Sequence, residues 1–448
     1  MNEIIVFLIA IAIMLFLMMK TSMGAFASML LAALLIAMGC GIPANDAIST
    51  VVDGFGNSCK SLGIVIIFGT MLGSFLEKAN AMQRISKTMI KTCGEDKSDV
   101  ALGITGFIVG IPVFSDVALI MLSPLAKALS KRTKFKVGAL ATMLSISLLT
   151  TFALVAPTPG PLAIAEIFHL DVGVSIIWGL IAAVVATIVG MLFCRLVLNK
   201  KDDSWWVKTE IEEEKEAHEV IEKAELDDSE MPSFFISLLP ILGPILLIIV
   251  NSVCGVLFEE GSSILAVTEF LGNKNIALAF GVLLCIVLLG KYFGKKEVSK
   301  VMSDSLSAAG PVMFITAAGS TLAAVVNTTS IGDTFTTALA ASGLPIVLVP
   351  FLISGFSKFA QGSGSTAGIM SAGLTAPLIE AGLISAPVAF VSVCAGTLFL
   401  AHVNNSFFWV FSNIFGFDTK TTLKSLCVGS SLVALGGLAV AIVMSLFM

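Results

Sequence analysis

The sequence predicts an all-α integral membrane protein built from two inverted repeats of five transmembrane helices, each with a re-entrant hairpin and a broken helix. Three observations predict it: a charge-poor composition, two apolar segments too short to cross a bilayer twice, and a correspondence between the two halves. Of the 448 residues, 56% are hydrophobic and 13% are charged, and the mean hydropathy is +1.00. Soluble domains have about 25% charged residues, so this composition indicates surfaces that face lipid.

Composition and motifs also narrow the class of protein. The net charge of −5 offers no basic face for phosphates, so no nucleic-acid partner is expected. The sequence has no CxxC, HExxH, GxSxG or Walker motif, so we expect neither a metal site nor an enzyme. The first apolar segment, 4–19, lacks a basic flank and a clean cleavage site, which favours a retained helix over a signal peptide.

Ten apolar segments are long enough to be transmembrane spans, because a helix crosses the hydrocarbon core with about 20 residues. Two of them, 137–168 and 386–417, are overlong and interrupted by polar or Pro-rich residues, which predicts broken helices. The hydrophilic segment 199–232 is interpreted as a linker between the repeats 1–198 and 233–448. The ten spans are 3–19, 22–40, 61–77, 137–168, 172–196, 233–257, 275–291, 309–327, 386–417 and 424–447.

The distribution of lysine and arginine predicts the orientation. Segments without either residue are expected outside, and segments rich in them are expected in the cytoplasm. This rule makes the linker 199–232 cytoplasmic, and counting spans from there leaves both termini outside. The basic segments are 78–97, 127–136, 195–208 and 291–300, and the segments that lack basic residues are 42–58, 258–273 and 328–343.

Two apolar segments do not fit as ordinary spans. Residues 98–127 have cytoplasmic flanks on both sides, yet two crossings need about 20 residues each. This segment therefore predicts a re-entrant hairpin that turns at 110–116, with the sequence GIPVFSD. Residues 344–382 have external flanks on both sides and predict a second hairpin, which turns at 361–366 and enters from the opposite face.

The two halves correspond at a constant offset. The residues GTMLG from Gly69 match GSTLA from Gly319, 250 positions later, and the same offset pairs the two hairpin turns. The Pro-rich break at 157–161 falls near the partner position of the polar break at 402–406. Since the matched helices run in opposite directions, the repeats are inverted. Inverted repeats with helices broken near the midplane are typical of secondary transporters.

The four interruptions are expected to form one site, because irregular backbone at membrane depth occurs only where protein buries it or a watery cavity wets it. The helix after each hairpin turn is expected to begin at an N-cap, Ser115 in one and Ser365 or Thr366 in the other. Helix N-termini attract anions, which predicts a small-molecule carboxylate as substrate. The predicted binding residues are Pro112, Val113, Phe114, Ser115, Thr158, Gly160, Gln361, Gly362, Ser363, Gly364, Ser365, Thr366, His402, Asn404 and Asn405.

Two charged residues lie at the hairpin turns. A carboxylate at the centre of a transmembrane helix costs about 2.5–3.5 kcal/mol on insertion, so Asp116 is expected to carry the coupling proton or to accept a substrate hydroxyl; an N-terminal cap is the structural alternative. Lys358 is the only lysine or arginine between Lys300 and Lys420. It is interpreted as a charge partner, either of a buried carboxylate or of the substrate.

Four motifs in order resemble the gluconate permease (GntP) family of the ion transporter superfamily. They are GIPVFSDV at 110–117, APTPGP at 156–161, AQGSGS at 360–365 and HVNNSFFW at 402–409. The resemblance runs from about residue 20 to the C-terminus. It implies proton-coupled uptake of gluconate, related sugar acids, hydroxy acids or D-serine, by a homodimer whose transport domain moves as an elevator. Family members commonly carry His, Asp and Arg where this sequence has Thr158, Asn405 and Lys358.

The expected function is therefore secondary active symport of a small hydrophilic organic acid in the inner membrane of a bacterium. Protons are the expected coupling ion, with sodium left open, and no resident cofactor is expected. The alternatives are a facilitative channel for small anions and an intramembrane enzyme that uses Asp116 and His402. The remaining expected partner is the lipid bilayer.

Overall fold

The computed structural model describes residues 3–21, 23–206, 231–258, 262–329, 344–403 and 405–448. Every regular element in these ranges is a helix, which confirms the all-α class. Seven helical segments in the described ranges are long and apolar enough to cross a membrane, and they coincide with seven of the ten predicted spans. The other three predicted spans, 3–19, 22–40 and 386–417, contain shorter apolar helices.

The same order of elements occurs in both halves of the chain. A long helix is followed by a helical hairpin, a broken helix and another long helix; the opposite orientation of the two sets stays a prediction. The first half contains α1 (Glu3–Lys20), α2 (Gly24–Gly39), α3 (Ala44–Lys78), α4 (Ala81–Cys93), α5 (Ser98–Val109), α6 (Ser115–Arg132), α7 (Val137–Leu154), α8 (Pro159–Ile167) and α9 (Val172–Leu196). The second half contains α11 (Phe234–Leu257), α12 (Ser263–Gly272), α13 (Lys274–Leu284), α14 (Lys295–Asn327), α16 (Leu348–Gln361), α17 (Gly364–Glu380), α18 (Ala386–Gly396), α19 (Ser406–Phe415), α20 (Thr419–Thr422) and α21 (Val428–Met444).

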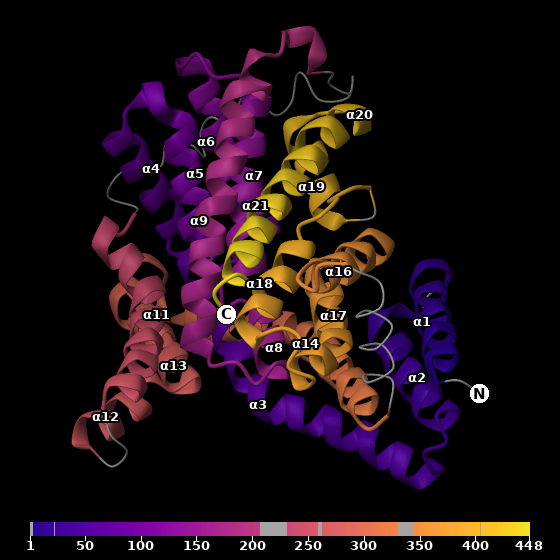
Figure 1. The fold of residues 1–448 in the computed structure, drawn as a ribbon. Coiled ribbons are helices and arrows are strands. Elements are labelled where there is room, and N and C mark those ends of the chain that lie inside the picture. Colours follow the sequence, from indigo (N-terminus) through magenta and orange to yellow (C-terminus); the bar gives the residue numbers. More distant parts are fainter. Residues whose placement is uncertain (1–2, 22, 207–230, 259–261, 330–343, 404) are drawn as a thin grey trace.

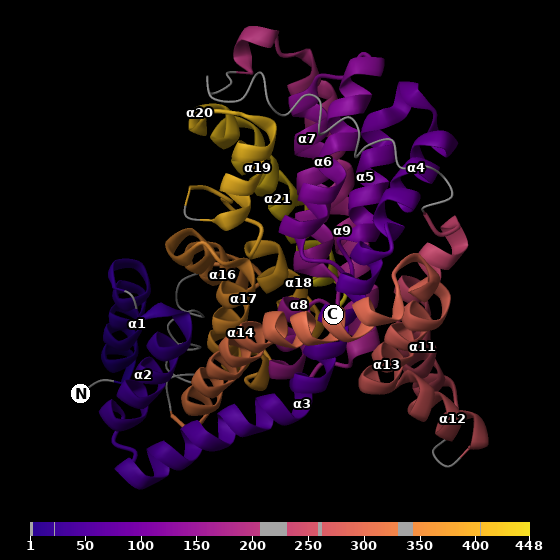
Figure 2. The same ribbon diagram turned by 180° about the vertical axis from the view of Figure 1, so that it is seen from behind.

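The helices pack in two groups. Helices α3 and α14 lie side by side and join two flanks, α1 and α2 on one side and α11 to α13 on the other (Figures 1 and 2). We call these seven helices the frame. The hairpins, the broken helices and the long helices α9 and α21 pack against one another between the flanks, and we call them the central bundle: α5 to α9, α16 to α19, and α21.

Helix α3 is longer than the sequence predicted. The predicted span 61–77 is only the second half of a helix that begins at Ala44, so residues 44–58, which precede the predicted span, are also helical. This extension packs on α14, where a Cβ added at Gly54 would lie 3.1 Å from the Thr321 Cα. Tertiary contact between the two backbones therefore supports a helix whose local sequence is only weakly apolar. Helix α14 likewise begins at Lys295, before its predicted span.

The two hairpins turn where the sequence predicted. In the first, α5 ends at Val109 and α6 begins at Ser115; in the second, the residues between α16 and α17 are Gly362 and Ser363. Gly362 has a φ of 81°, in the left-handed region where glycine is favoured because it has no Cβ. That conformation reverses the chain in two residues. That both hairpins are re-entrant stays a prediction.

Both predicted helix breaks are present. The first separates α7 from α8 at residues 155–158 and includes a cis peptide bond between Ala156 and Pro157. The second separates α18 from α19, and hydroxyls of α21 bind its irregular backbone: Ser431 Oγ accepts from the Leu400 N–H at 3.3 Å and Ser430 Oγ accepts from the Ala401 N–H at 3.1 Å. These bonds satisfy backbone groups that a continuous helix would pair internally.

Close packing in the central bundle makes Gly396→Ala a destabilising change. A Cβ at this position of α18 would lie 2.5 Å from the Phe351 carbonyl oxygen and 2.7 Å from the Ser354 Cβ of α16. We expect a loss of about 1–3 kcal/mol, as for other overpacked cores, read as a lower thermal midpoint in detergent. Gly56→Ala is the control, since no described atom lies within 4 Å of that Cβ position. Equal midpoints for the two variants would contradict the packing argument.

Candidate functional site

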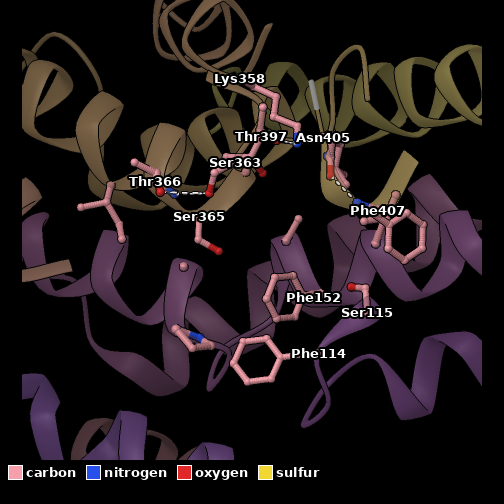
Figure 3. Close-up of a pocket in the computed structure, with 18 of the residues that line it drawn as sticks. Phe114, Ser115, Phe152, Lys358, Ser363, Ser365, Thr366, Thr397, Asn405 and Phe407 are labelled. Atoms are coloured by element: carbon pink, nitrogen blue, oxygen red, sulfur yellow. Dashed lines mark hydrogen bonds between the residues drawn. The ribbon is translucent and has the colours of Figure 1, made fainter. Parts of the chain in front are cut away.

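A cavity of about 430 Å³ lies where the hairpin turns and helix breaks meet. Figure 3 shows residues of the second hairpin and second break on one side, including Lys358, Ser363, Thr397 and Asn405, and Phe114, Ser115 and Phe152 of the first half on the other. The two hairpin tips therefore face the same space.

Four helix N-termini converge on this cavity. Its wall includes Ser115 at the start of α6, Pro159 at the start of α8, Gly364 at the start of α17 and Ser406 at the start of α19. The first N–H groups of a helix have no intrahelical acceptor, and each N-terminus carries the equivalent of about half a positive charge. Their convergence makes the cavity a favourable place for an anion.

The N-caps lie slightly before the predicted positions. Helix α17 is capped by Ser363, whose Oγ accepts a hydrogen bond from the Thr366 N–H at 3.4 Å; the predicted caps Ser365 and Thr366 belong to its first turn. Helix α6 follows Phe114, so Ser115 is its first helical residue rather than its cap. Gly362 explains the shift in the second hairpin, because its left-handed conformation lets the helix resume two residues later. Helix α19 is capped by Asn405, whose Oδ1 accepts from the Phe407 N–H at 2.9 Å.

Lys358 places a buried ammonium group at the cavity. Its side chain is only 3% exposed, and Nζ donates a hydrogen bond to the carbonyl oxygen of Gly362, at the C-terminal end of α16. A cation near helix C-terminal carbonyls is electrostatically favourable. The same group lines the cavity, so in its protonated form it adds a positive charge to the four helix N-termini.

Asp116 adds a carboxyl group to the wall of the same cavity. It is the second residue of α6, where a negative side chain is stabilised by the helix N-terminus. Its Oδ1 atom is buried and has no hydrogen-bond partner among the described residues, and its charge interacts with that of Lys358. Asp116 is thus a carboxylate in the cavity wall with one oxygen that the described residues leave without a partner.

Comparison with known proteins identifies the family. The family model described as GntP family permease matches residues 2–447, nearly the whole chain. The chain belongs to the GntP permease family. It is accordingly a multi-pass membrane transporter and not an enzyme, and the alternative of an intramembrane enzyme is set aside.

Relatives of this GntP permease are similar over their full lengths. An uncharacterized permease of Haemophilus influenzae is 32% identical over 443 residues, which cover 97% of this chain and 90% of that protein. The Gnt-II system L-idonate transporter of Escherichia coli is 27% identical, with 96% and 95% covered. The low-affinity gluconate transporter of Escherichia coli is 28% identical, with 93% and 92% covered.

Solved structures of other transporters share the fold of this GntP permease. MtrF of Neisseria gonorrhoeae, described within a class of antimetabolite efflux pumps, superposes with a TM-score of 0.65 at 14% identity, covering 90% of this chain and 84% of that one. The YdaH transporter of Alcanivorax borkumensis gives a TM-score of 0.66 at 12% identity, covering 90% and 89%. At these identities the likeness concerns the fold alone.

Most of the predicted site residues of this GntP permease do line the cavity. They come from the first hairpin tip, the start of α8, the second hairpin and the start of α19. The residues are Phe114, Ser115, Asp116, Gly160, Lys358, Gly362, Ser363, Gly364, Ser365, Thr366 and Asn405. At one point the elements nearly touch, since a Cβ at Gly160 would lie 3.3 Å from the Ser365 Oγ.

Three predicted residues lie behind the cavity wall. Pro112 and Thr158 line a separate cavity of about 20 Å³, large enough for roughly one water molecule. The Thr158 hydroxyl donates to the Val155 carbonyl oxygen at 2.6 Å, so it closes the helix break rather than facing the larger cavity. Val113 is 3% exposed and packs in the hydrophobic core.

The three remaining predicted residues, His402, Asn404 and Gln361, belong to the second helix break and the second hairpin. His402 does not line the cavity; its Nε2 lies 3.1 Å from the Phe359 carbonyl oxygen, and its ring is 4.5 Å from the Phe359 ring centroid. This position suits packing against α16. Asn404 and the side chain of Gln361 lie outside the described residues.

The cavity also has walls that the motifs did not indicate. Leu149, Phe152 and Ala153 come from the apolar body of α7, and Ile315 and Thr316 come from α14. Phe152 contacts Phe114 with ring centroids 5.7 Å apart, and this pair separates the two cavities. In the sequence these residues belong to mainly apolar segments, so nothing there distinguishes them from ordinary core residues.

Proposed function

We propose that this GntP permease is a proton-coupled symporter for a small hydroxylated carboxylic acid of the sugar-acid type, in the inner membrane of a bacterium. One observation carries the proposal: four helix N-termini and the buried Lys358 ammonium surround one cavity. Its volume of about 430 Å³ is in the range of small-ligand sites. The L-idonate and gluconate transporters among the relatives handle acids of this class, with one carboxylate and several hydroxyls.

Asp116 supplies a reason for coupling to protons. An ionised Asp116 in the cavity wall repels the substrate carboxylate, and protonating Asp116 removes that repulsion. The acid and the proton therefore favour each other's binding, and by linkage this coupling is reciprocal. A carrier that takes up both together uses the proton gradient to concentrate the acid.

Lys358 supplies a reason against sodium coupling. In secondary transporters, carbonyl groups at the C-terminal ends of half-helices coordinate the coupling cation. In this chain the Lys358 ammonium already binds such a carbonyl, that of Gly362 at the end of α16. We therefore propose that a fixed cation occupies the position that sodium takes in such proteins, and that transport does not depend on sodium.

The division into frame and central bundle supports movement of the bundle past the frame within a homodimer. Two polar contacts between the groups form at the same end: Lys274 Nζ lies 2.6 Å from Glu166 Oε2, and Ser252 Oγ donates to Asp171 Oδ1 at 2.6 Å. In the elevator motion proposed here, both contacts break when the bundle moves. They therefore stabilise the conformation described here.

Uptake into proteoliposomes tests the proposed function. With radiolabelled gluconate or L-idonate and an acidic exterior, we expect accumulation against the concentration gradient that a protonophore abolishes. Replacing sodium with choline is expected to leave the rate unchanged. A facilitative channel would only equilibrate the acid, and a sodium-coupled carrier would lose accumulation in choline. Absence of uptake of either acid would contradict the sugar-acid assignment.

A further inference from the structure

The hydroxyl of Thr316 on α14 is a buried polar group that the fold does not use. Its side chain is 1% exposed, it lines the large cavity, and its Oγ1 has no hydrogen-bond partner in the described part of the chain. A buried hydroxyl without a partner destabilises a protein. At a cavity wall, such a group points to a partner that arrives with the ligand.

Several other threonines of the long helices show the usual arrangement, whereas Thr187 on α9 also lacks a partner among the described residues but does not line the cavity. A threonine within a helix can donate its hydroxyl to the carbonyl four residues earlier. Thr321 on the same helix does so, to Ala317 at 2.9 Å, and Thr70 on α3 donates to Ile66 at 2.8 Å. Thr316 departs from this pattern at a position that lines the cavity.

Two more buried oxygens at the cavity lack partners among the described residues, Ser115 Oγ and Asp116 Oδ1. Both come from the first hairpin tip, and Figure 3 shows Ser115 across the cavity from Lys358. The Lys358 side of the cavity thus suits a carboxylate. The unpartnered oxygens of Thr316, Ser115 and Asp116 suit hydrogen bonds with hydroxyl groups of a ligand. An acid with hydroxyls along its chain matches both parts.

We propose that Thr316 binds a hydroxyl group of the transported acid and selects hydroxylated acids over their deoxy analogues. This inference rests on the proposed function, and it adds a specificity-determining residue that belongs to the frame. The other polar residues of the cavity belong to the central bundle, so the bound acid bridges the two groups of helices through Thr316.

Binding by purified protein tests the inference, with gluconate and the set of gluconates that each lack one hydroxyl. We expect Thr316→Val to weaken gluconate binding about tenfold, the usual effect of one lost hydrogen bond. One deoxy analogue is expected to bind about tenfold more weakly to the unmodified protein and to lose nothing further in the variant. Thr316→Ser, which keeps the hydroxyl, is expected to retain gluconate affinity.

Thr321→Val is the matched control, because that hydroxyl is bonded within α14 and does not line the cavity. It is expected to leave gluconate affinity unchanged. If Thr316→Val weakens gluconate and every deoxy analogue equally, or leaves gluconate binding intact, Thr316 is not a hydroxyl ligand. If the unmodified protein binds neither gluconate nor any deoxy analogue, the sugar-acid proposal fails, and this inference with it. Thermal midpoints of all variants show whether each one is folded.

Discussion

The Asp116→Asn variant is expected to lose gradient-driven accumulation of the acid while counterflow exchange continues. A neutral side chain mimics protonated Asp116, so the acid still binds, but no proton is taken up with it. With one proton per acid, a pH difference of one unit supports about tenfold accumulation. We expect this ratio for the unmodified protein and a ratio near one for the variant, measured in proteoliposomes.

Asp418→Asn is the matched control for this experiment. Asp418 caps α20 by accepting from the Thr421 N–H at 2.7 Å, it lies outside the cavity, and asparagine is an equally good N-cap. This variant is expected to accumulate the acid normally. Continued accumulation by Asp116→Asn would show that Asp116 serves as a substrate ligand or helix cap, and that another group carries the proton.

The Lys358→Met variant is expected to bind the acid on the order of 100-fold more weakly, with binding measured by calorimetry. Methionine preserves length and apolar contacts but removes the buried positive charge that faces the substrate carboxylate. Truncating one partner of a buried charge pair costs about 2–5 kcal/mol, which corresponds to about 30-fold to several thousandfold in affinity. The variant also frees the Gly362 carbonyl, so its thermal midpoint is expected to fall.

Two controls separate the charge of Lys358 from its packing. Lys358→Arg keeps the positive charge and is expected to lose less affinity than Lys358→Met. Lys131→Met removes an exposed charge at the end of α6 and is expected to change nothing. Unchanged affinity in Lys358→Met would show that Lys358 only closes the end of α16 and makes no contact with the substrate.

The sequence by itself determined the membrane class, the position of most spans and the location of both hairpin turns and both breaks. The physical reason is that lipid leaves backbone groups without partners, so any interruption of a helix at membrane depth needs Gly, Pro or capping residues that stand out locally. Gly362, Ser363 and Asn405 are such residues, and each one occupies a turn or a cap at the cavity.

Only the tertiary structure decided which apolar and partly polar residues complete the site. In a membrane helix, an apolar residue can face lipid, core or cavity, so Phe152 and Ile315 resemble their neighbours in sequence. Thr316 is one hydroxyl in such a run, and only packing shows that it lacks a partner. Thr158 and His402 do not line the cavity, because their side chains form hydrogen bonds with nearby backbone carbonyl groups. Long-range packing also extended α3 and α14, whose first turns carry no apolar signal of their own.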